Sequence, residues 1–358
     1  MVKICLVLGT RPEIIKVSSI IRACEKKSIE YFLIHTGQHY DKNMDGIFFE
    51  QLQLKDPKYN LKIGSCSPGK QIALMIEKIE EILVQECPDV VLVQGDTNSV
   101  LAGALATNKN NIKVGHIEAG LRSYDKKMPE EHNRVVVDHI SDFLFAPTVD
   151  AAQNIDKEGI DKKKVFVVGN TAVDAVFQNS TIAKEFVDVL TKFNLQNNEY
   201  IVTTAHRPAN VDDSSNLKKL IDGLNAVANE LKIQIIFAVH LRTKKRIEEN
   251  NLKLHESIKM IDPVGYLEFL QLMENAKVII TDSGGIQEEA SILKVPCVTI
   301  RENTERPETI AIGCNVLAGI DPDKIVACTK TMINKARDWS SPYGDGTAGE
   351  KIVELLLK

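Results

Sequence analysis

The sequence has no apolar run long enough to span a membrane, for which about 20 consecutive residues are needed. Its seven cysteines are an odd number, and no two of them stand in a Cys-x-x-Cys spacing. This pattern argues against a disulfide framework and against a zinc cluster. The first residues lead directly into a strand, without the basic region and long apolar core of a signal peptide. We therefore expect reduced thiols and a cytoplasmic protein.

Several common ligand-binding motifs are also missing. The turn Gly9-Thr10-Arg11-Pro12-Glu13 lacks the Gly-x-Gly-x-x-Gly of dinucleotide-binding Rossmann domains, and no Walker lysine loop occurs. There is no His-Glu-x-x-His or Gly-x-Ser-x-Gly sequence, and the eight histidines have no metal-ligand spacing. The net charge of -5 provides no strong positive field for nucleic acid or an acidic membrane. An anionic ligand must therefore be bound by local groups.

What is present is a regular alternation of strands and helices along 358 residues, which are enough for two domains. This alternation implies right-handed crossovers and parallel sheets covered on both faces. Buried strands are predicted at residues 3–8, 31–36, 90–93, 113–117, 143–146, 165–168, 200–204, 234–239, 258–261, 278–281 and 296–300. Helices are predicted, among others, at residues 71–87, 172–177, 181–193 and 347–357.

The predicted fold class is therefore α/β, with two doubly wound Rossmann-like domains that face each other across a cleft. We place the N-terminal domain at residues 1–169, joined by a C-terminal helix at 345–358. The C-terminal domain is placed at residues 170–344. The polar loops should lie at the carboxyl ends of the strands in each domain.

The stretch 278–290 predicts a strand, a tight turn and a helix start. Gly284 and Gly285 permit unusual backbone angles, and Glu288 and Glu289 suit a first helical turn. Such a turn is a potential phosphate site, although a Gly-Gly pair after a strand is often only a sharp turn. A helix terminus contributes only about 0.3–1 kcal/mol, up to ~2 when partly buried, whereas micromolar binding requires roughly 8 kcal/mol. We therefore expect at least two basic partners, each contributing about 1.5–3 kcal/mol through charge-assisted bonds.

Three acidic residues, Asp96, Glu118 and Glu130, lie in or beside strand-end loops of the first domain. Any one of them taken alone is more simply a solvated loop carboxylate. Carboxylates that are brought together shift one another's pKa, which allows one site to hold a proton donor and a proton acceptor. Basic residues that can reach the same cleft are Arg11 and Lys16 at the first strand-helix turn and Arg134, His206 and Arg207 in predicted loops.

Several of these stretches together resemble the non-hydrolysing UDP-N-acetylglucosamine 2-epimerases, which have a GT-B type fold. The similar segments occur in order along essentially the whole chain, and each alone is weakly specific. They are Gly9-Thr10-Arg11-Pro12-Glu13, Thr36-Gly37-Gln38-His39, Gln94-Gly95-Asp96-Thr97, residues 116–122, Pro129-Glu130-Glu131 with Asn133-Arg134, residues 281–289 and residues 301–308.

The resemblance implies an enzyme that interconverts UDP-GlcNAc and UDP-ManNAc without a cofactor or metal. A base removes the proton on sugar C2 while UDP leaves C1, which gives a 2-acetamidoglucal. UDP then adds back and C2 is reprotonated from the opposite face. A homodimer is a further expectation from the family, as is a role in polysaccharide biosynthesis, and neither nucleic acid nor a membrane is an expected partner.

The resemblance also assigns roles by motif. It implies that Asp96, Glu118 and Glu130 are acid–base carboxylates, without saying which serves which face of the sugar, and that His206 assists UDP departure or proton transfer. Residues that resemble the family's substrate- and UDP-binding groups are Arg11, Lys16, Arg134, Phe269, Ser283, Gly284, Gly285 and Glu289. A second UDP-sugar site, which activates some bacterial members, corresponds to Gln38, His39, Gln71 and Arg207.

The sequence departs from the family pattern at two positions near the implied activator site. The family commonly has His-Arg-x-Glu-Asn, where this chain has His206-Arg207-Pro208-Ala209-Asn210. Many members have an Asn-Pro pair where this chain has Leu241-Arg242-Thr243. Alternatives are a hydrolysing epimerase that releases free N-acetylmannosamine, an epimerase of a 2,3-diacetamido uronic acid sugar, a glycosyltransferase, and a nucleotide-sugar binding or regulatory protein without turnover.

Overall fold

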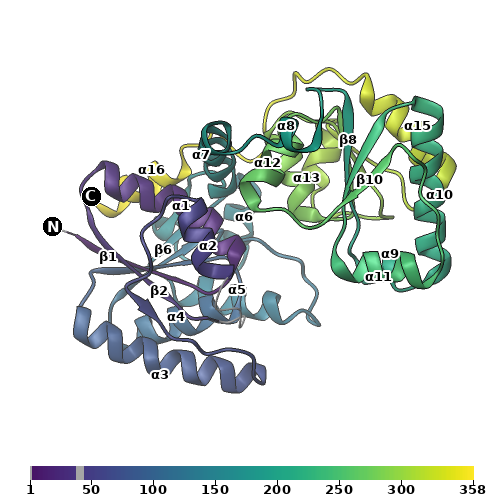
Figure 1. Cartoon of the computed structure of the whole chain (residues 1–358). Helices are drawn as coiled ribbons and strands as arrows, with labels where there is room; N and C mark the ends of the chain where they lie inside the picture. The colour runs from purple at the N-terminus through teal and green to yellow at the C-terminus, as the bar shows by residue number, and fades with distance from the viewer. Residues whose placement is uncertain (1, 38–43) are drawn as a thin grey trace. The chain divides into compact units, whose positions relative to one another are not determined.

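A computed structural model describes residues 2–37 and 44–358 (Figure 1). The chain divides into two compact units. Unit 1 comprises Met1–Ala175 and Tyr343–Lys358, and unit 2 comprises Val176–Pro342. The division falls within helix α7 (Thr171–Phe186), so the chain leaves unit 1 along a helix and re-enters it just before residue 343.

Unit 1 is built on a parallel sheet of seven strands in the order β3-β2-β1-β4-β5-β6-β7. Its strands are β1 (Lys3–Leu8), β2 (Glu30–His35), β3 (Tyr59–Asn60), β4 (Val90–Gln94), β5 (Lys113–Ile117), β6 (Phe143–Ala146) and β7 (Val165–Val167). Its helices are α1 (Arg11–Lys26), α2 (Met44–Gln51), α3 (Pro68–Glu86), α4 (Asn98–Lys109), α5 (Pro129–Ile140), α6 (Val149–Lys157), the 3-10 helix η1 (Lys162–Lys164) and α16 (Ala348–Leu356).

Unit 2 has a parallel sheet of six strands in the order β10-β9-β8-β11-β12-β13. Its strands are β8 (Tyr200–Thr204), β9 (Gln234–Ala238), β10 (Ile258–Ile261), β11 (Val278–Thr281), β12 (Cys297–Thr299) and β13 (Asn315–Leu317). Its helices are α8 (Val189–Phe193), α9 (Pro208–Val211), α10 (Ser214–Leu231), α11 (Leu241–Glu249), α12 (Tyr266–Glu274), α13 (Gly284–Ile292), α14 (Pro307–Ala311) and α15 (Pro322–Ile333).

Helices cover both faces of each sheet, so the central strands carry apolar side chains on both sides. Every residue of β4 and β8 is buried, including side chains on alternate faces. A parallel sheet that is covered on both sides requires such continuous apolar runs. The two-unit, doubly wound α/β architecture confirms the predicted fold class.

Some local predictions were wrong. The predicted helices at 172–177 and 181–193 are a continuous α7 followed by the short α8. Arg134, predicted in a loop, lies in the second turn of α5, and Glu130 lies in its first turn. Strands β3 and β13, at residues 59–60 and 315–317, were not predicted.

The last helix, α16, packs beside α1 of unit 1 (Figure 1). A Cβ atom added to Gly349 would lie 2.9 Å from the backbone of Ser19, so the two helices touch where only glycine fits. The buried carboxylate of Asp174 on α7 accepts a hydrogen bond from Gly349 N at 2.8 Å. The C-terminal segment is thus part of the unit 1 core.

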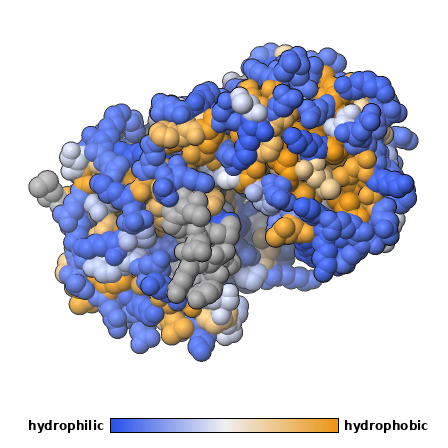
Figure 2. Space-filling view, viewed as in Figure 1, coloured by the Kyte–Doolittle hydropathy of each residue, from blue (hydrophilic) through white to orange (hydrophobic). Residues whose placement is uncertain are grey.

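No helix among the described residues is long and apolar enough to cross a membrane. The visible surface is mainly hydrophilic, with smaller apolar areas on each unit (Figure 2).

Candidate active site

Each sheet has a position where the strand order changes direction. In unit 1 it lies between β1 and β4, and in unit 2 it lies between β8 and β11. Loops that leave the carboxyl ends of such strands diverge, which opens a crevice where ligands bind in doubly wound folds. The candidate residues follow these strands: Arg11 and Asp96 in unit 1, and His206 and Ser283 in unit 2.

The turn after β1 is held by a buried carboxylate. Glu13 accepts hydrogen bonds from the Gly9 and Thr10 backbone N–H groups, both at 2.7 Å, and from the Thr97 hydroxyl at 2.6 Å. Burial raises the pKa of Glu13, although these hydrogen bonds partly oppose the rise. Glu13 therefore ties the β1–α1 turn to the turn that follows Asp96.

Two cations stand at the start of α1. The Arg11 guanidinium lies 5.3 Å from the centre of the Phe48 ring, and Lys16 Nζ lies 2.5 Å from Glu118 Oε1. Glu118 has φ +68°, a left-handed conformation that is rare outside glycine and concentrates at functional sites. A Cβ atom built on Gly95 would lie 3.6 Å from Glu118 Oε2. The Glu118 carboxylate therefore lies next to the loop that carries Asp96.

Asp96 is paired with Arg134 of α5, and Arg134 Nη1 also donates to Glu131 at 2.9 Å. Glu131 accepts further hydrogen bonds from Ser123 and Tyr124 backbone N–H groups, at 2.9 and 2.8 Å. Burial would raise the pKa of Glu131, but these bonds and Arg134 hold it below its ordinary value. Glu131, which the sequence analysis did not single out, thus orients Arg134 toward Asp96.

Glu130 is exposed in the first turn of α5 and directly precedes Glu131. Its position between Pro129 and Glu131 places it on the helix that also carries Arg134. The structure therefore attaches all three predicted carboxylates to adjacent elements of unit 1, with Asp96 after β4, Glu118 after β5 and Glu130 on α5.

The residues implied for an activator site are only partly visible. Gln38 and His39 lie outside the described residues. Gln71 is buried, donates to Gly64 O at 3.0 Å and accepts from Asn98 Nδ2 at 2.9 Å. Asn133 in turn donates to Asp96 O at 2.9 Å and contacts Asn98. Gln71 is therefore linked through amide side chains to the Asp96 loop.

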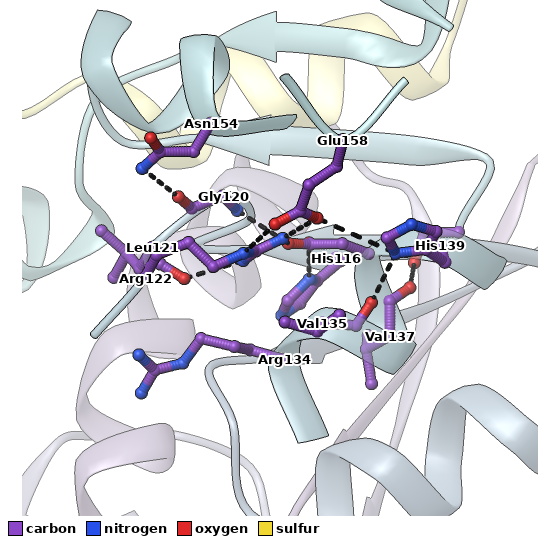
Figure 3. Close-up of polar contacts among 12 residues, drawn as sticks. His116, Gly120, Leu121, Arg122, Arg134, Val135, Val137, His139, Asn154 and Glu158 are labelled. Carbon is purple, nitrogen blue, oxygen red and sulfur yellow. Dashed lines mark hydrogen bonds and ion pairs between the residues drawn. The ribbon is translucent and has the colours of Figure 1, made fainter. Parts of the chain in front are cut away.

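A group of charged residues, most of them buried, lies next to the loop after β4 (Figure 3). We name it the His116 cluster, and its members are His116, Arg122, Asp138 and Glu158. His116 Nδ1 lies 2.6 Å from Asp138 Oδ1, and its Nε2 lies 2.8 Å from Gly95 O. Burial alone would lower the pKa of His116, but the charge and hydrogen bond of Asp138 and the Gly95 carbonyl raise it above its ordinary value.

Arg122 joins the other side of the same cluster. Its guanidinium lies 2.7 Å from Asp138 Oδ2 and makes two 2.7 Å hydrogen bonds with Glu158 at the end of α6. The Arg134 side chain points away from this cluster, toward Asp96 (Figure 3). His116 and Arg122 belong to the family motif at residues 116–122, but the motif alone indicates no role for them.

In unit 2, the buried Asp282 organises the loop that carries His206. Asp282 Oδ2 accepts hydrogen bonds from the backbone N–H groups of His206 and Arg207, at 2.9 and 2.8 Å, and from Asn210 at 3.2 Å. His206 Nδ1 lies 3.0 Å from Asp282 Oδ1, while the ring itself is 46% exposed. Burial would raise the pKa of Asp282, but the hydrogen bonds from His206 and Arg207 lower it below its ordinary value.

The glycine turn differs from the prediction in two respects. Helix α13 begins at Gly284, directly after the N-cap Ser283, so both glycines are helical and neither has a positive φ. Glu288 and Glu289 therefore lie in the second turn and not in the first. The space beside Gly285 is open, since an added Cβ would meet no atom within 4 Å. The glycine thus leaves room for a close approach rather than supplying an unusual turn.

A pocket of about 220 Å³ lies beside this helix. Its lining includes His206, Val264, Phe269 and Ile286. Complete small-molecule sites usually measure about 300–1,000 Å³. The pocket is therefore large enough for only part of a nucleotide-sized ligand.

The segment after β12 is fastened to α13. Thr304 Oγ1 donates to Gln287 Oε1 at 2.5 Å, and Arg306 Nε donates to Glu288 at 3.1 Å. Hydrogen bonds from Arg301 hold the pKa of Glu305 at about 2.

Within residues 2–37 and 44–358, no group of three or more His, Cys, Asp or Glu side chains is arranged to hold a metal ion.

Comparison with known proteins decides the family. Residues 22–357 match the family model described as UDP-N-acetylglucosamine 2-epimerase. The chain belongs to the UDP-N-acetylglucosamine 2-epimerase family. It is therefore an enzyme, an isomerase of the epimerase type.

Relatives with names and structures agree with this assignment. A Methanocaldococcus jannaschii protein named UDP-N-acetylglucosamine 2-epimerase is 54% identical over 99% of this chain and 98% of its own length. The crystal structure of the M. jannaschii enzyme in complex with UDP-GlcNAc and UDP has a TM-score of 0.85 and 54% identity, and the match covers 99% of each chain. A Pseudomonas aeruginosa relative, UDP-2,3-diacetamido-2,3-dideoxy-D-glucuronate 2-epimerase, is 39% identical over 99% of both chains.

Proposed function

We propose that this epimerase interconverts UDP-GlcNAc and UDP-ManNAc through a 2-acetamidoglucal. The observation that carries the proposal is the set of carboxylates and cations at the switch-point edge of unit 1, where Lys16 contacts Glu118 and Arg134 contacts Asp96. Inversion at a carbon next to the anomeric centre requires proton transfer on both faces of the sugar. The named M. jannaschii relative, at 54% identity, supports this substrate in preference to a diacetamido uronate.

The reaction is balanced without an external oxidant or reductant. A carboxylate takes the C2 proton, the electrons of the C2–H bond form the C1–C2 double bond, and the electrons of the C1–O bond leave with UDP. In the return step, UDP oxygen attacks C1 and C2 receives a proton from the other face. We assign the two proton-transfer roles to the set Asp96, Glu118 and Glu130.

Departure of UDP generates negative charge on the diphosphate, which fixed positive charge stabilises. We assign this task to Arg11, Lys16 and Arg134. His206 assists as a donor to the departing group, since Asp282 fixes its Nδ1 side while its ring remains partly exposed. Exclusion of water from the reactive intermediate favours re-addition over hydrolysis.

Unit 2 supplies the groups that hold UDP. The N-terminus of α13, with Ser283, Gly284 and Gly285, offers N–H and hydroxyl donors to phosphate. Glu289 binds the ribose hydroxyls, and the pocket beside Phe269 takes the uracil. Gln71 and Arg207, with Gln38 and His39, remain the candidate second UDP-sugar site.

The test is incubation with UDP-GlcNAc in deuterated water, followed by NMR of the sugar. Deuterium at C2 in both epimers supports the proposal, whereas free N-acetylmannosamine with UDP indicates hydrolysis. A parallel incubation with UDP-2,3-diacetamido-2,3-dideoxyglucuronate tests the other sugar specificity. Absence of exchange and turnover on both substrates would refute the proposed activity.

Single variants then test the residue roles. Asp96→Asn, Glu118→Gln and Glu130→Gln should each lower turnover by about 10²–10⁴-fold, the usual contribution of acid–base groups. Their circular dichroism and melting temperature should stay close to wild type. Near-normal turnover in any one of them removes that residue from the acid–base set.

A further inference from the structure

Each ring nitrogen of His116 lies within hydrogen-bonding distance of an acceptor. Nδ1 faces the Asp138 carboxylate at 2.6 Å, and Nε2 faces the Gly95 carbonyl at 2.8 Å. A carbonyl oxygen has no hydrogen to donate, so Nε2 must carry the proton. A neutral ring would then present an unprotonated Nδ1 to Asp138 Oδ1.

The other contacts of Asp138 decide where the second proton lies. Its Oδ2 accepts from Gly120 N at 3.0 Å and lies 2.7 Å from the Arg122 guanidinium, so an ionised carboxylate is favoured. Both ring nitrogens of His116 therefore carry hydrogen, and the ring is an imidazolium. The cluster contains two cations and two anions, so its charges balance, with Glu158 partly exposed.

The elements that meet at this cluster are those that carry the proposed acid–base groups. Nε2 holds the Gly95 carbonyl, one residue before Asp96. His116 is two residues before Glu118. Asp138 Oδ2 accepts a hydrogen bond from the N–H of Gly120, which is two residues after Glu118. Asp138 is on α5, which also carries Glu130 and Arg134.

Resting on the proposed function, we infer that the buried His116 imidazolium is a positioning residue that sets the relative placement of the Asp96 and Glu118 loops. It cannot touch substrate directly, since its side chain is 0% exposed and all its polar atoms face the protein. It acts through Gly95 on one side and through Asp138 and Gly120 on the other.

The charged groups around the ring come from four elements of unit 1. They are Asp138 of α5, Arg122 of the loop after β5, Glu158 at the end of α6, and Asp96 of the loop after β4. Asp138 and Asp96 favour the charged ring, whereas Arg122 opposes it and is itself paired with Glu158. The positive charge on the His116 ring therefore depends on two ion pairs, His116–Asp138 and Arg122–Glu158.

The protonation state is tested directly on the wild-type protein by ¹⁵N NMR of the histidine side chains. His116 should show two protonated ring nitrogens with similar chemical shifts at neutral pH. His255 provides an internal contrast in the same spectrum, because its Nδ1 accepts from Ser257 N at 3.1 Å and cannot carry hydrogen there. A spectrum in which His116 is a neutral tautomer at neutral pH overturns the inference.

Two substitutions separate the two halves of the tether. In His116→Gln the amide nitrogen can take the place of Nε2 and keep the hydrogen bond to Gly95 O. In His116→Asn the amide nitrogen can take the place of Nδ1 and keep the hydrogen bond to Asp138. We expect kcat of His116→Asn to fall by about 10²-fold, as for a small misplacement of a reacting group. His116→Gln should retain at least fivefold more activity, with KM of both variants within about threefold of wild type.

The control is His255→Asn, in unit 2 and outside the proposed machinery, which should keep wild-type kcat and KM. Equal kcat in the two His116 variants, or a change confined to KM, would count against a positioning role. If His116→Asn does not fold, the decision rests on the ring spectrum and on His116→Gln, whose kcat should still fall severalfold.

A failure of the proposed function can be told apart from a failure of this inference. If wild-type protein does not turn over UDP-GlcNAc, the proposed function fails. The ring spectrum then still tests the imidazolium, and the backbone amide resonances of Asp96 and Gly120 test the tether. The Asp96 resonance should shift in His116→Asn, which loses the bond to Gly95, and the Gly120 resonance should shift in His116→Gln, which loses the bond to Asp138. Resonances that do not move in either variant would refute the tether.

Discussion

Replacing Asp282 by Asn tests how the loop carrying His206 is held. The two side chains have nearly the same shape, but Asn has one accepting oxygen where Asp has two. That oxygen can accept from the His206 and Arg207 N–H groups in the place of Oδ2, now without a negative charge. The amide NH₂ would then face His206 Nδ1, which loses its carboxylate partner.

The expected loss follows from the strengths of these bonds. Hydrogen bonds to a charged group contribute about 1.5–3 kcal/mol, and neutral ones about 0.5–1.5 kcal/mol. Two backbone bonds changed from the first kind to the second give roughly 2 kcal/mol in the free energy of unfolding of unit 2. Because Asp282 is fully buried, solvent screening does not reduce this figure as it would on the surface.

The measurement is chemical denaturation of wild type and Asp282→Asn, with Asp262→Asn as the control. Asp262 is 74% exposed and paired with Lys244 at 3.0 Å, and such surface pairs contribute only about 0–1 kcal/mol. Turnover of UDP-GlcNAc should also fall in Asp282→Asn, because His206 loses its orientation. A loss of unfolding free energy no larger than that of Asp262→Asn would refute the reasoning.

The stability difference between wild type and Asp282→Asn should depend on pH in a defined way. The pKa of Asp282 is lowered in the folded state, so its contribution to stability is complete above its ordinary value of 3.8 and is lost as pH falls through the lowered pKa. The stability difference between wild type and Asp282→Asn should therefore be constant between about pH 5 and 8. A difference that disappears within that range would contradict this assignment.

Three further predictions concern other positions. Gly285→Ala should raise the unfolding free energy by about 0.5–1 kcal/mol yet weaken UDP binding in calorimetry, whereas Gly69→Ala, at the same second position of α3 and equally open, should leave UDP binding unchanged. Glu289→Ala should weaken UDP binding about tenfold, a loss of ~1.4 kcal/mol, and an unchanged affinity would refute the ribose role. The stabilising contribution of the His116 imidazolium is fully present below its ordinary pKa of 6.5 and declines as pH rises through the raised pKa. The difference in melting temperature between wild type and His116→Gln should thus shrink at alkaline pH.

The sheets were predictable because buried parallel strands are continuous apolar runs. Strand β11 (Val278–Thr281), for example, is buried at every residue and has the predicted bounds. Strand β13 was missed because it is three residues long and only Asn315 is buried. The start of α5 carries Pro129 and two acidic residues, which are helix-start signals. Arg134 was nevertheless placed in a loop, although it lies in the second turn of this helix.

The candidate residues were predictable from motifs, but their partners were not. Asp138 lies 22 residues from His116, and the contact between them depends on how α5 packs against β5. Likewise, Asp282 and His206 are 76 residues apart and meet because β8 and β11 are neighbours in the sheet. Helix packing brings the first pair together, and strand order brings the second. A sequence motif gives the reacting groups more readily than the groups that orient them.

The packing of α16 on α1 has a consequence for the order of folding during synthesis. Lys26 and Glu350 form an ion pair across 324 residues of sequence, and Gly349 seats against Ser19. Unit 1 therefore cannot bury α1 completely until residues 343–358 have left the ribosome, whereas the whole of unit 2 has emerged before then. We expect unit 2 to finish folding first, with the apolar side of α1 exposed to chaperones in the meantime.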